Sequence, residues 1–246
     1  MVDFGTFSDF SLPDRILVLD TETTGLKGGR LESHPLMERL LRSSQDVPDE
    51  VFNDMDWSMC GDLVVEVGLC EVDLVAHTVR EVYSSLVGYD ITSWTDEMRS
   101  AWIFENSYIS LDEVAGARPF TEVRRDLVEI IRGRHLTTYN VQFDLDRFLY
   151  RFPWNLKGLF TECRDIMFSA TDYCKLESTR PGQEYRYPTL EHAYENVFGG
   201  SDPAGIGDDP GHRALVDAKA AAHVLLGLHD RGCYDILDYS GRHGRA

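Results

Sequence analysis

A chain of 246 residues of which 43% are hydrophobic can bury a core of ordinary size, and this length favours one domain with insertions over two. Its formal net charge of −18 at pH 7 argues against a protein that coats DNA non-specifically, because an acidic surface repels polyanions at long range. The charge does not exclude an enzyme that acts on the end of a nucleic acid, since screening limits the repulsion to about 8 Å at physiological salt.

The cysteines and the apolar runs bear on the cellular compartment. Five widely spaced cysteines without a Cys-x-x-Cys motif indicate neither a disulfide framework nor a zinc ribbon. No stretch approaches the roughly 20 apolar residues of a membrane span, and the first fifteen residues lack the pattern of a signal peptide. We therefore expect a cytoplasmic protein without membrane contact. The many acids and few lysines indicate either adaptation to high salt or an ordinary acidic protein.

Strands and helices are expected to alternate along the chain. In chain order, the patterns predict a strand at 15–20, strands at 62–74 and 79–88, a helix at 119–132, a strand at 135–139, a helix at 141–150, a strand at 159–166, and helices at 189–197 and 214–228. The short connection at 75–78 favours an antiparallel hairpin. The alternation predicts an α/β domain with a mixed sheet flanked by helices.

We expect a single domain over residues 1–246, although two segments do not fit a minimal domain. Residues 27–61 form a long insertion between the first two strands, and 35–43 within it predict a short amphipathic helix. The Gly- and Pro-rich residues 199–211 predict a flexible loop, and 239–246 a flexible tail. The insertion covers a cleft or docks a partner on one hypothesis and is a surface elaboration on the other.

Two carboxylates follow the first predicted strand, in the sequence Asp-Thr-Glu-Thr-Thr-Gly of residues 20–25. Because side chains in a strand alternate, Asp20 and Glu22 point the same way. Two unpaired carboxylates that close repel each other, and one would be protonated unless a cation sat between them. The pair therefore indicates a divalent metal, although so acidic a chain also produces Asp-x-Glu by chance.

Asp144 supplies a third candidate carboxylate. It follows the predicted strand at 135–139 by about one helical turn, which is near the sheet edge where the sites of α/β proteins usually lie. Taken alone, it is more simply explained as a solvated acid on a helix.

His212 and Asp217 surround the start of the last predicted helix. Five residues advance a helix by about 500°, so these two side chains cannot share one helix face. We expect His212 on the Pro-Gly loop and Asp217 one turn into the helix. Asp217 lies on or beside the apolar stripe of that helix, where an acid is costly to bury unless it binds something.

In this order and with this spacing, these residues resemble the DEDDh exonucleases of the ribonuclease H-like superfamily, a group that includes polymerase proofreading subunits, ribonuclease T and oligoribonuclease. The resemblance spans roughly residues 14–228. Three motifs carry it, namely Asp20-Thr-Glu22-Thr-Thr-Gly, Asn140-x-x-Phe143-Asp144 and His212-x-x-x-x-Asp217. Each motif is short, but the three in order make coincidence improbable.

The resemblance implies a ribonuclease H-like mixed sheet and a metal-dependent 3′→5′ exonuclease that releases nucleoside 5′-monophosphates from DNA, the favoured substrate, or RNA. It implies two divalent cations, Mg²⁺ or Mn²⁺, held by Asp20, Glu22, Asp144 and Asp217, and oxygen-only ligation suits these ions better than zinc. His212 would be the general base, since an ordinary histidine pKa of about 6.5 suits proton removal near neutrality.

Four further residues are expected to contact the 3′ end: Thr23, Leu26, Asn140 and Phe143. Leu26 resembles the apolar residue that wedges against the terminal base in relatives, whereas plain helix packing is an equal alternative for Phe143. The arginine-aromatic stretch 147–154 and the arginines at 124, 125, 132 and 134 are weaker candidates for nucleic-acid contacts.

Two departures from the family pattern concern substrate choice. Many relatives carry a histidine where this chain has Tyr139, and many have a shorter connection than 27–61. Expected partners are nucleic-acid 3′ ends, single-stranded above all, with a homodimer or a polymerase or repair partner left open. DNA and RNA both remain open as substrates, because the choice depends on whether the pocket admits a 2′-hydroxyl. A catalytically silent module of the same fold that binds nucleic acid or a partner is the alternative.

Overall fold

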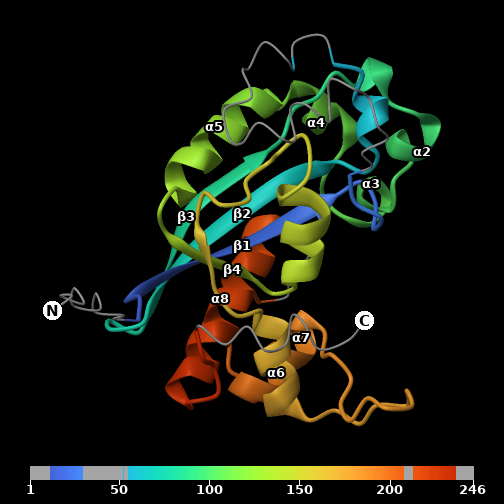
Figure 1. Cartoon of the computed structure of the whole chain (residues 1–246). Helices are drawn as coiled ribbons and strands as arrows, with labels where there is room; N and C mark the ends of the chain where they lie inside the picture. The colour runs from blue at the N-terminus through green and yellow to red at the C-terminus, as the bar shows by residue number, and fades with distance from the viewer. Residues whose placement is uncertain (1–11, 30–51, 53–54, 208–212, 237–246) are drawn as a thin grey trace, which may run out of the picture.

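A five-stranded mixed sheet forms the centre of the molecule, with its strands in the order β3-β2-β1-β4-β5 (Figure 1). The structure is a computed structural model that describes residues 12–29, 52, 55–207 and 213–236. Its strands are β1 Arg15–Thr23, β2 Val64–Asp73, β3 Thr78–Leu86, β4 His135–Thr138 and β5 Thr161–Glu162. The first three strands pair antiparallel, β4 runs parallel to β1, and β5 runs parallel to β4. The expected mixed α/β architecture is confirmed.

Helices cover both faces of this sheet. In chain order the described helices are η2 Trp57–Cys60, η3 Ile91–Ser93, α2 Asp96–Arg99, α3 Trp102–Asn106, α4 Leu111–Gly116, α5 Phe120–Ile131, the π-helix η4 Gln142–Leu149, α6 Ile166–Cys174, α7 Leu190–Phe198 and α8 Ala214–Asp230. The long helix α8 contacts β1, β2 and β3. Its many alanines are strong helix formers with small side chains, so they favour both the helix and its close packing.

The two faces of the sheet carry separate apolar layers, because neighbouring side chains of a strand point to opposite faces. On β1, Leu17 and Leu19 belong to the layer that packs with α5, whereas Ile16 and Val18 belong to the layer that packs with α6, α7 and α8. All four side chains are fully buried. Side chains of even number on β1 therefore face α8, and this alternation positions the candidate site.

Most predicted elements are confirmed to within a few residues, with three differences. The helix expected at 141–150 is a π-helix over Gln142–Leu149, and the fifth strand contains only Thr161–Glu162. The first strand is longer than predicted, because its pairing with β2 continues through Thr21 and Glu22. Sequence analysis did not predict α6 or the short helices α2, α3 and α4.

The end of the insertion at 27–61 belongs to the core. Phe52 and Trp57 are 4% and 5% exposed, and both rings contact Phe120 of α5 at centroid distances of 5.0 and 5.3 Å. Trp57 also packs edge-on against Tyr89 at 4.7 Å. A pure surface elaboration does not describe these residues.

Other sequence predictions lie partly or wholly outside the described residues. These are the amphipathic helix at 35–43, the tail at 239–246 and the last part of the loop at 199–211. In the described part of that loop, the Asp202 carboxylate accepts hydrogen bonds from two backbone amides and from the Tyr194 hydroxyl. None of the five cysteines forms a disulfide, and no described helix is long and apolar enough to cross a membrane.

Candidate metal-binding and active site

Three carboxylates meet between β1 and the first turns of α8. Asp20 and Glu22 continue the series of even-numbered side chains on β1, so they point to the face that α8 covers. One oxygen from each of Asp20, Glu22 and Asp217 lies within 4.8 Å of the other two. The structure therefore brings together two acids from one strand and a third acid from a helix near the other end of the chain.

Gly68 allows α8 to approach the sheet closely enough for this meeting. Gly68 lies on β2 directly opposite Asp20. A Cβ atom at this position would lie 2.3 Å from the backbone of Ala214 and of Leu215, which is closer than real Cβ atoms approach. The first turn of α8 therefore rests on the bare backbone of β2.

Glu66 and Arg213 form a buried contact beside the cluster that sequence analysis missed. Glu66 is 1% exposed and stands opposite Glu22 in the sheet. Nε and Nη2 of Arg213 both donate to Glu66 Oε1, at 3.0 and 2.6 Å. The sequence contained one signal, an acid inside an apolar strand, but the partner lies 147 residues away and no local pattern reports it.

Asp144 lies next to the cluster and is held separately. It projects from the π-helix η4 and is 2% exposed. The Thr21 hydroxyl donates to its Oδ1 at 2.7 Å. Burial raises the pKa of Asp144 to about 7, although the hydrogen bond from Thr21 lowers it. π-Helical turns are rare and often occur at functional sites.

The carboxylates of β1 carry strongly perturbed pKa values. Burial, followed by the nearby charges of Asp217 and Glu66, raises the pKa of Glu22 to about 8. Burial and then the charges of Asp144 and Asp217 raise the pKa of Asp20 well above its ordinary value. The charged forms are thus disfavoured in the absence of a compensating cation, which is the behaviour expected of an acidic metal site.

The donor set fits Mg²⁺ or Mn²⁺. The facing side chains of Asp20, Glu22 and Asp217 offer only carboxylate oxygens, which hard divalent cations prefer. Glu22 is buried and the other two are partly buried, so the mutual repulsion of the three carboxylates favours the uptake of positive charge. His212, the predicted general base, lies outside the described residues.

The loop after β1 presents Leu26 to solvent. Leu26 is 73% exposed. The Asp62 carboxylate accepts hydrogen bonds from the backbone amides of Lys27 and Gly28 at 2.8 and 3.2 Å. On the other side, Arg147 of η4 donates to the Leu26 carbonyl at 2.7 Å. Asp62, just before β2, and Arg147 of η4 therefore hold the backbone of this loop, while the Leu26 side chain stays exposed to solvent.

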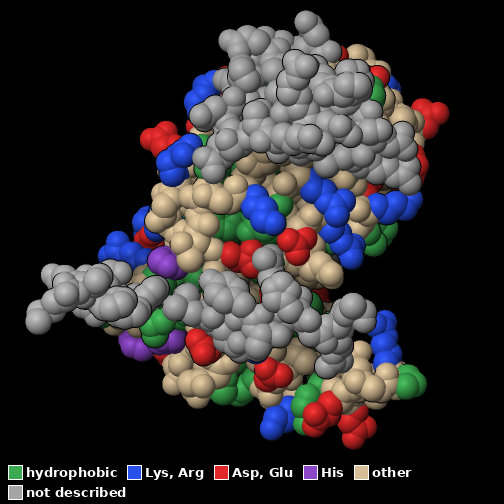
Figure 2. All heavy atoms as spheres, in the orientation of Figure 1, with side chains coloured by type: hydrophobic (Ala, Val, Ile, Leu, Met, Phe, Trp, Pro, Cys, Tyr) green, Lys and Arg blue, Asp and Glu red, His purple; other side chains and the backbone are tan. Residues whose placement is uncertain are grey.

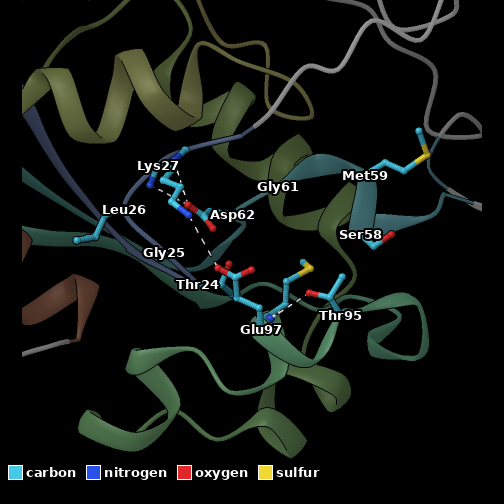
Figure 3. Close-up of a pocket in the computed structure, with 12 residues that line it drawn as sticks. Thr24, Gly25, Leu26, Lys27, Ser58, Met59, Gly61, Asp62, Thr95 and Glu97 are labelled. Atoms are coloured by element: carbon cyan, nitrogen blue, oxygen red, sulfur yellow. Dashed lines mark hydrogen bonds and ion pairs between the residues drawn. The ribbon is translucent and has the colours of Figure 1, made fainter.

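A pocket of about 620 Å³ adjoins this loop (Figure 3). It lies between residues 24–28, residues 58–62 around the end of the insertion at 27–61, and residues 95–98 at the start of α2. Figure 3 shows Lys27 pointing toward Asp62 and Glu97, whereas Leu26 points away from them. Thr24, which lines the pocket, lies two positions after Glu22. The pocket therefore adjoins the segment that carries the cluster.

The remaining predicted substrate residues are only partly exposed. The Thr23 hydroxyl donates to the Gly25 carbonyl at 2.7 Å, and the Asn140 side chain accepts from the Phe143 amide at 3.2 Å. The Phe143 ring lies 5.2 Å from that of Phe148. These contacts stabilise the loop after β1 and the start of η4.

Two of the weaker arginine candidates are engaged within the fold. Arg124 is 6% exposed and donates to the Trp154 carbonyl, and Arg134 pairs with Glu71. The aromatic side chains of the stretch 147–154 are also largely packed inside, since Phe148, Phe152 and Trp154 are each at most 2% exposed. These aromatic side chains are therefore not exposed stacking surfaces for bases.

Basic side chains nevertheless gather near acidic ones on one face. Figure 2 shows Lys and Arg side chains across the middle of the molecule, directly above a group of Asp and Glu side chains. An otherwise acidic protein therefore has local positive charge on this face, and such charge acts over the short range that salt does not screen.

The sequence and the structure of this chain were compared with those of known proteins. No family model matches the sequence, and no curated protein matches it. Solved structures do match. The nuclease domain of 3′hExo, a DEDDh family member bound to rAMP, superposes with a TM-score of 0.53 at 16% identity, covering 92% of this chain and 96% of that chain. The chain has the DEDDh 3′-exonuclease fold.

Two further structures with the DEDDh 3′-exonuclease fold agree. A full-length 3′-exonuclease matches with a TM-score of 0.53 at 16% identity, covering 91% of this chain and 85% of that chain. Exonuclease I of E. coli in complex with a dT13 oligonucleotide matches with a TM-score of 0.51 at 14% identity, covering 89% of this chain but 42% of that chain. The ribonuclease H-like sheet expected from the sequence is confirmed.

Proposed function

We propose that this protein is a metal-dependent 3′→5′ exonuclease that hydrolyses phosphodiester bonds from the 3′ end of DNA or RNA and releases nucleoside 5′-monophosphates. The observation that carries the proposal is the meeting of Asp20, Glu22 and Asp217 within 4.8 Å, with Asp144 beside them, on the DEDDh exonuclease fold. Perturbed acids in such a cluster are typical of catalytic sites.

The roles proposed for the acids follow from their positions. Asp20, Glu22 and Asp217 would hold one divalent ion, and Asp20 with the adjacent Asp144 would hold a second. Such ions supply charge stabilisation for the attacking and leaving oxygens of an in-line displacement. Thr21 keeps Asp144 oriented through its hydroxyl.

The substrate end and the attacking water require further residues. His212 would accept the proton of the water at an imidazole nitrogen, a role that rests on its place five residues before Asp217 in the sequence. The exposed Leu26 would pack against the terminal base. The neighbouring pocket would receive nucleotides upstream of the end, because it continues from the strand that bears the cluster. The insertion would thereby contribute to substrate binding through Ser58, Met59 and Gly61.

The direct test uses 5′-labelled single-stranded DNA and RNA oligonucleotides of one sequence. With Mn²⁺ or Mg²⁺ the products should form a ladder that shortens from the 3′ end, with nucleoside 5′-monophosphates released, and EDTA should stop the reaction. A circular single strand should resist. Running DNA and RNA in parallel decides between the two substrates, which matters because solved structures of this fold include complexes with rAMP and with dT13.

Matched variants separate an active enzyme from a silent binding module. Asp217→Asn and Asp144→Asn should each lower kcat by at least about 100-fold, since metal stabilisation of the transition state is worth several kcal/mol. Glu129→Gln removes an exposed acid on α5 and should keep full activity. Retention of activity in both aspartate variants would refute the proposal, and binding of oligonucleotides without any hydrolysis would favour the silent module.

A further inference from the structure

We propose that Glu66 is a positioning residue for the metal site, because it fixes the start of α8 and thereby sets where Asp217 stands relative to Asp20 and Glu22. The inference rests on the proposed function, because its binding test needs the cluster to bind a divalent ion and its kcat test needs the proposed nuclease activity.

Glu66 caps the start of α8. Arg213 is the residue that precedes α8, and its side chain makes no capping hydrogen bond to the helix. Helix starts leave backbone N–H groups without partners inside the helix. Glu66 satisfies one of them from β2, because its Oε2 accepts from the Ala214 amide at 2.9 Å. Its negative charge at this end also complements the helix dipole.

The carboxylate of Glu66 also binds the side chain of Arg213, the residue before α8. Arg213 Nε lies 3.0 and 3.1 Å from the two oxygens of Glu66, and Nη2 lies 2.6 Å from Oε1. Guanidinium forks of this kind fix direction as well as distance. Glu66 is 1% exposed and Arg213 is partly exposed, so the carboxylate end of this ion pair is shielded from water.

The contacts of Glu66 with Arg213 and the Ala214 amide, here called the clamp, are linked to the candidate metal ligand Asp217. The Asp217 amide donates to the carbonyl of Arg213 at 3.1 Å, so Asp217 stands one turn after the clamped residue. On the sheet side, Glu66 lies opposite Glu22 in the β1–β2 register. One carboxylate therefore ties the strand pair that carries Glu22 to the helix that carries Asp217, and Gly68 leaves the space for this contact.

A second buried acid opposite Glu22 is energetically costly, which favours a specific role for Glu66. Like charges directly opposite each other in a sheet are destabilising, and Glu66 faces Glu22. Arg213 offsets the charge of Glu66, and its positive charge also lowers the pKa of Glu22. Residues that orient metal ligands from behind typically change metal affinity by about 10- to 100-fold when replaced.

Glu71 offers a matched control on the same strand. It is 3% exposed and pairs with Arg80 and Arg134, so it is another buried carboxylate held by arginine. It lies five positions after Glu66 and opposite Leu17 in the sheet, so its side chain points to the other face of β2, away from α8. Glu71→Gln and Glu66→Gln therefore each neutralise a buried carboxylate that pairs with partly exposed arginine, and only Glu66→Gln removes a contact to the start of α8.

The experiment measures Mn²⁺ binding to the full-length protein by the loss of the free-ion electron paramagnetic resonance signal. Glu66→Gln should raise the Mn²⁺ dissociation constant by about 10-fold, whereas Glu71→Gln should change it by less than about 2-fold. Saturating Mn²⁺ should return kcat of the Glu66→Gln variant to near the wild-type value. Equal shifts in the two glutamine variants, or a kcat that saturating Mn²⁺ does not restore, would overturn the inference.

Arg213→Gln distinguishes positioning from simple charge. Loss of a positive charge beside three carboxylates should tighten cation binding if charge alone mattered, whereas loss of the clamp should weaken it. We expect weaker binding, and tighter binding would contradict the inference. Because Arg213 is partly exposed, this variant also provides the test if Glu66→Gln does not fold. Absence of Mn²⁺ binding by the wild-type protein would instead refute the proposed function.

Discussion

Glu22 should make the metal-free protein lose stability as the pH rises. Its pKa lies near 8 in the folded protein against an ordinary 4.5, so the folded state retains a proton that the unfolded chain has released. A raised acid contributes its full stability below about pH 4.5, and that contribution is lost progressively up to about pH 8. Each pH unit inside this window costs about 1.4 kcal/mol.

The magnitude is large enough to measure. Between pH 6 and pH 8 the loss amounts to about 2.5 kcal/mol. For a domain of this size, that lowers Tm by about 5–10 °C. Adding Mn²⁺ should oppose the loss, because a ligand present at 100 times its dissociation constant stabilises the folded state by about 2.7 kcal/mol.

The assay is calorimetry in EDTA at pH 6 and pH 8, with and without excess Mn²⁺. Glu22→Gln should make the fall in Tm in EDTA smaller, because the amide mimics the protonated acid, while the raised pKa values of Asp20 and Asp144 account for the fall that remains. It should also remove most of the gain from Mn²⁺. Glu129→Gln changes the net charge equally on the exposed face of α5 and should behave like the wild type. If Glu22→Gln and wild type lose the same Tm between the two pH values, the electrostatic reasoning is wrong.

Three further changes test other parts of the site. Gly68→Ala should destabilise the protein by about 1–3 kcal/mol in urea unfolding and weaken Mn²⁺ binding, because its Cβ would meet the first turn of α8, whereas Gly116→Ala has open space and should be neutral. Thr21→Val removes a hydrogen bond that lowers the pKa of Asp144, so the acid limb of the pH–rate profile should move to higher pH, and an unmoved limb would exclude this role. Leu26→Ala should raise KM about 5- to 10-fold with a smaller change in kcat, since it removes apolar surface that a terminal base would cover, and an unchanged KM would exclude the contact.

The acids of β1 could be predicted because their signal is local. Alternation along a strand needs only neighbouring residues, and it placed Asp20 and Glu22 on one face. The strand nevertheless runs to Thr23, beyond the predicted end at 20, because pairing with β2 sustains a polar segment that lacks the apolar pattern. Asp217 could also be predicted from the sequence, since an acid beside the apolar stripe of a helix is unusual.

The features that sequence analysis missed depend on contacts between distant residues. The clamp between Glu66 and Arg213 joins positions 147 residues apart, and the need for Gly68 arises only when α8 lies on β2. The π-helical form of η4 has no signal in the apolar pattern, which fits an ordinary helix equally well. Phe52 belongs to the core although it lies in a segment that composition assigns to an insertion.

The acids of the site are held by contacts that do not require a metal. Asp217 follows a helix start that Glu66 fixes, and Asp144 accepts a hydrogen bond from Thr21. Folding therefore brings like charges together through anchors outside the cluster, at the cost expressed in the raised pKa values. Because these anchors already fix the acids, the site should lose little conformational entropy when a cation binds. The bound cation would also relieve the repulsion between the carboxylates, and this relief would strengthen its binding.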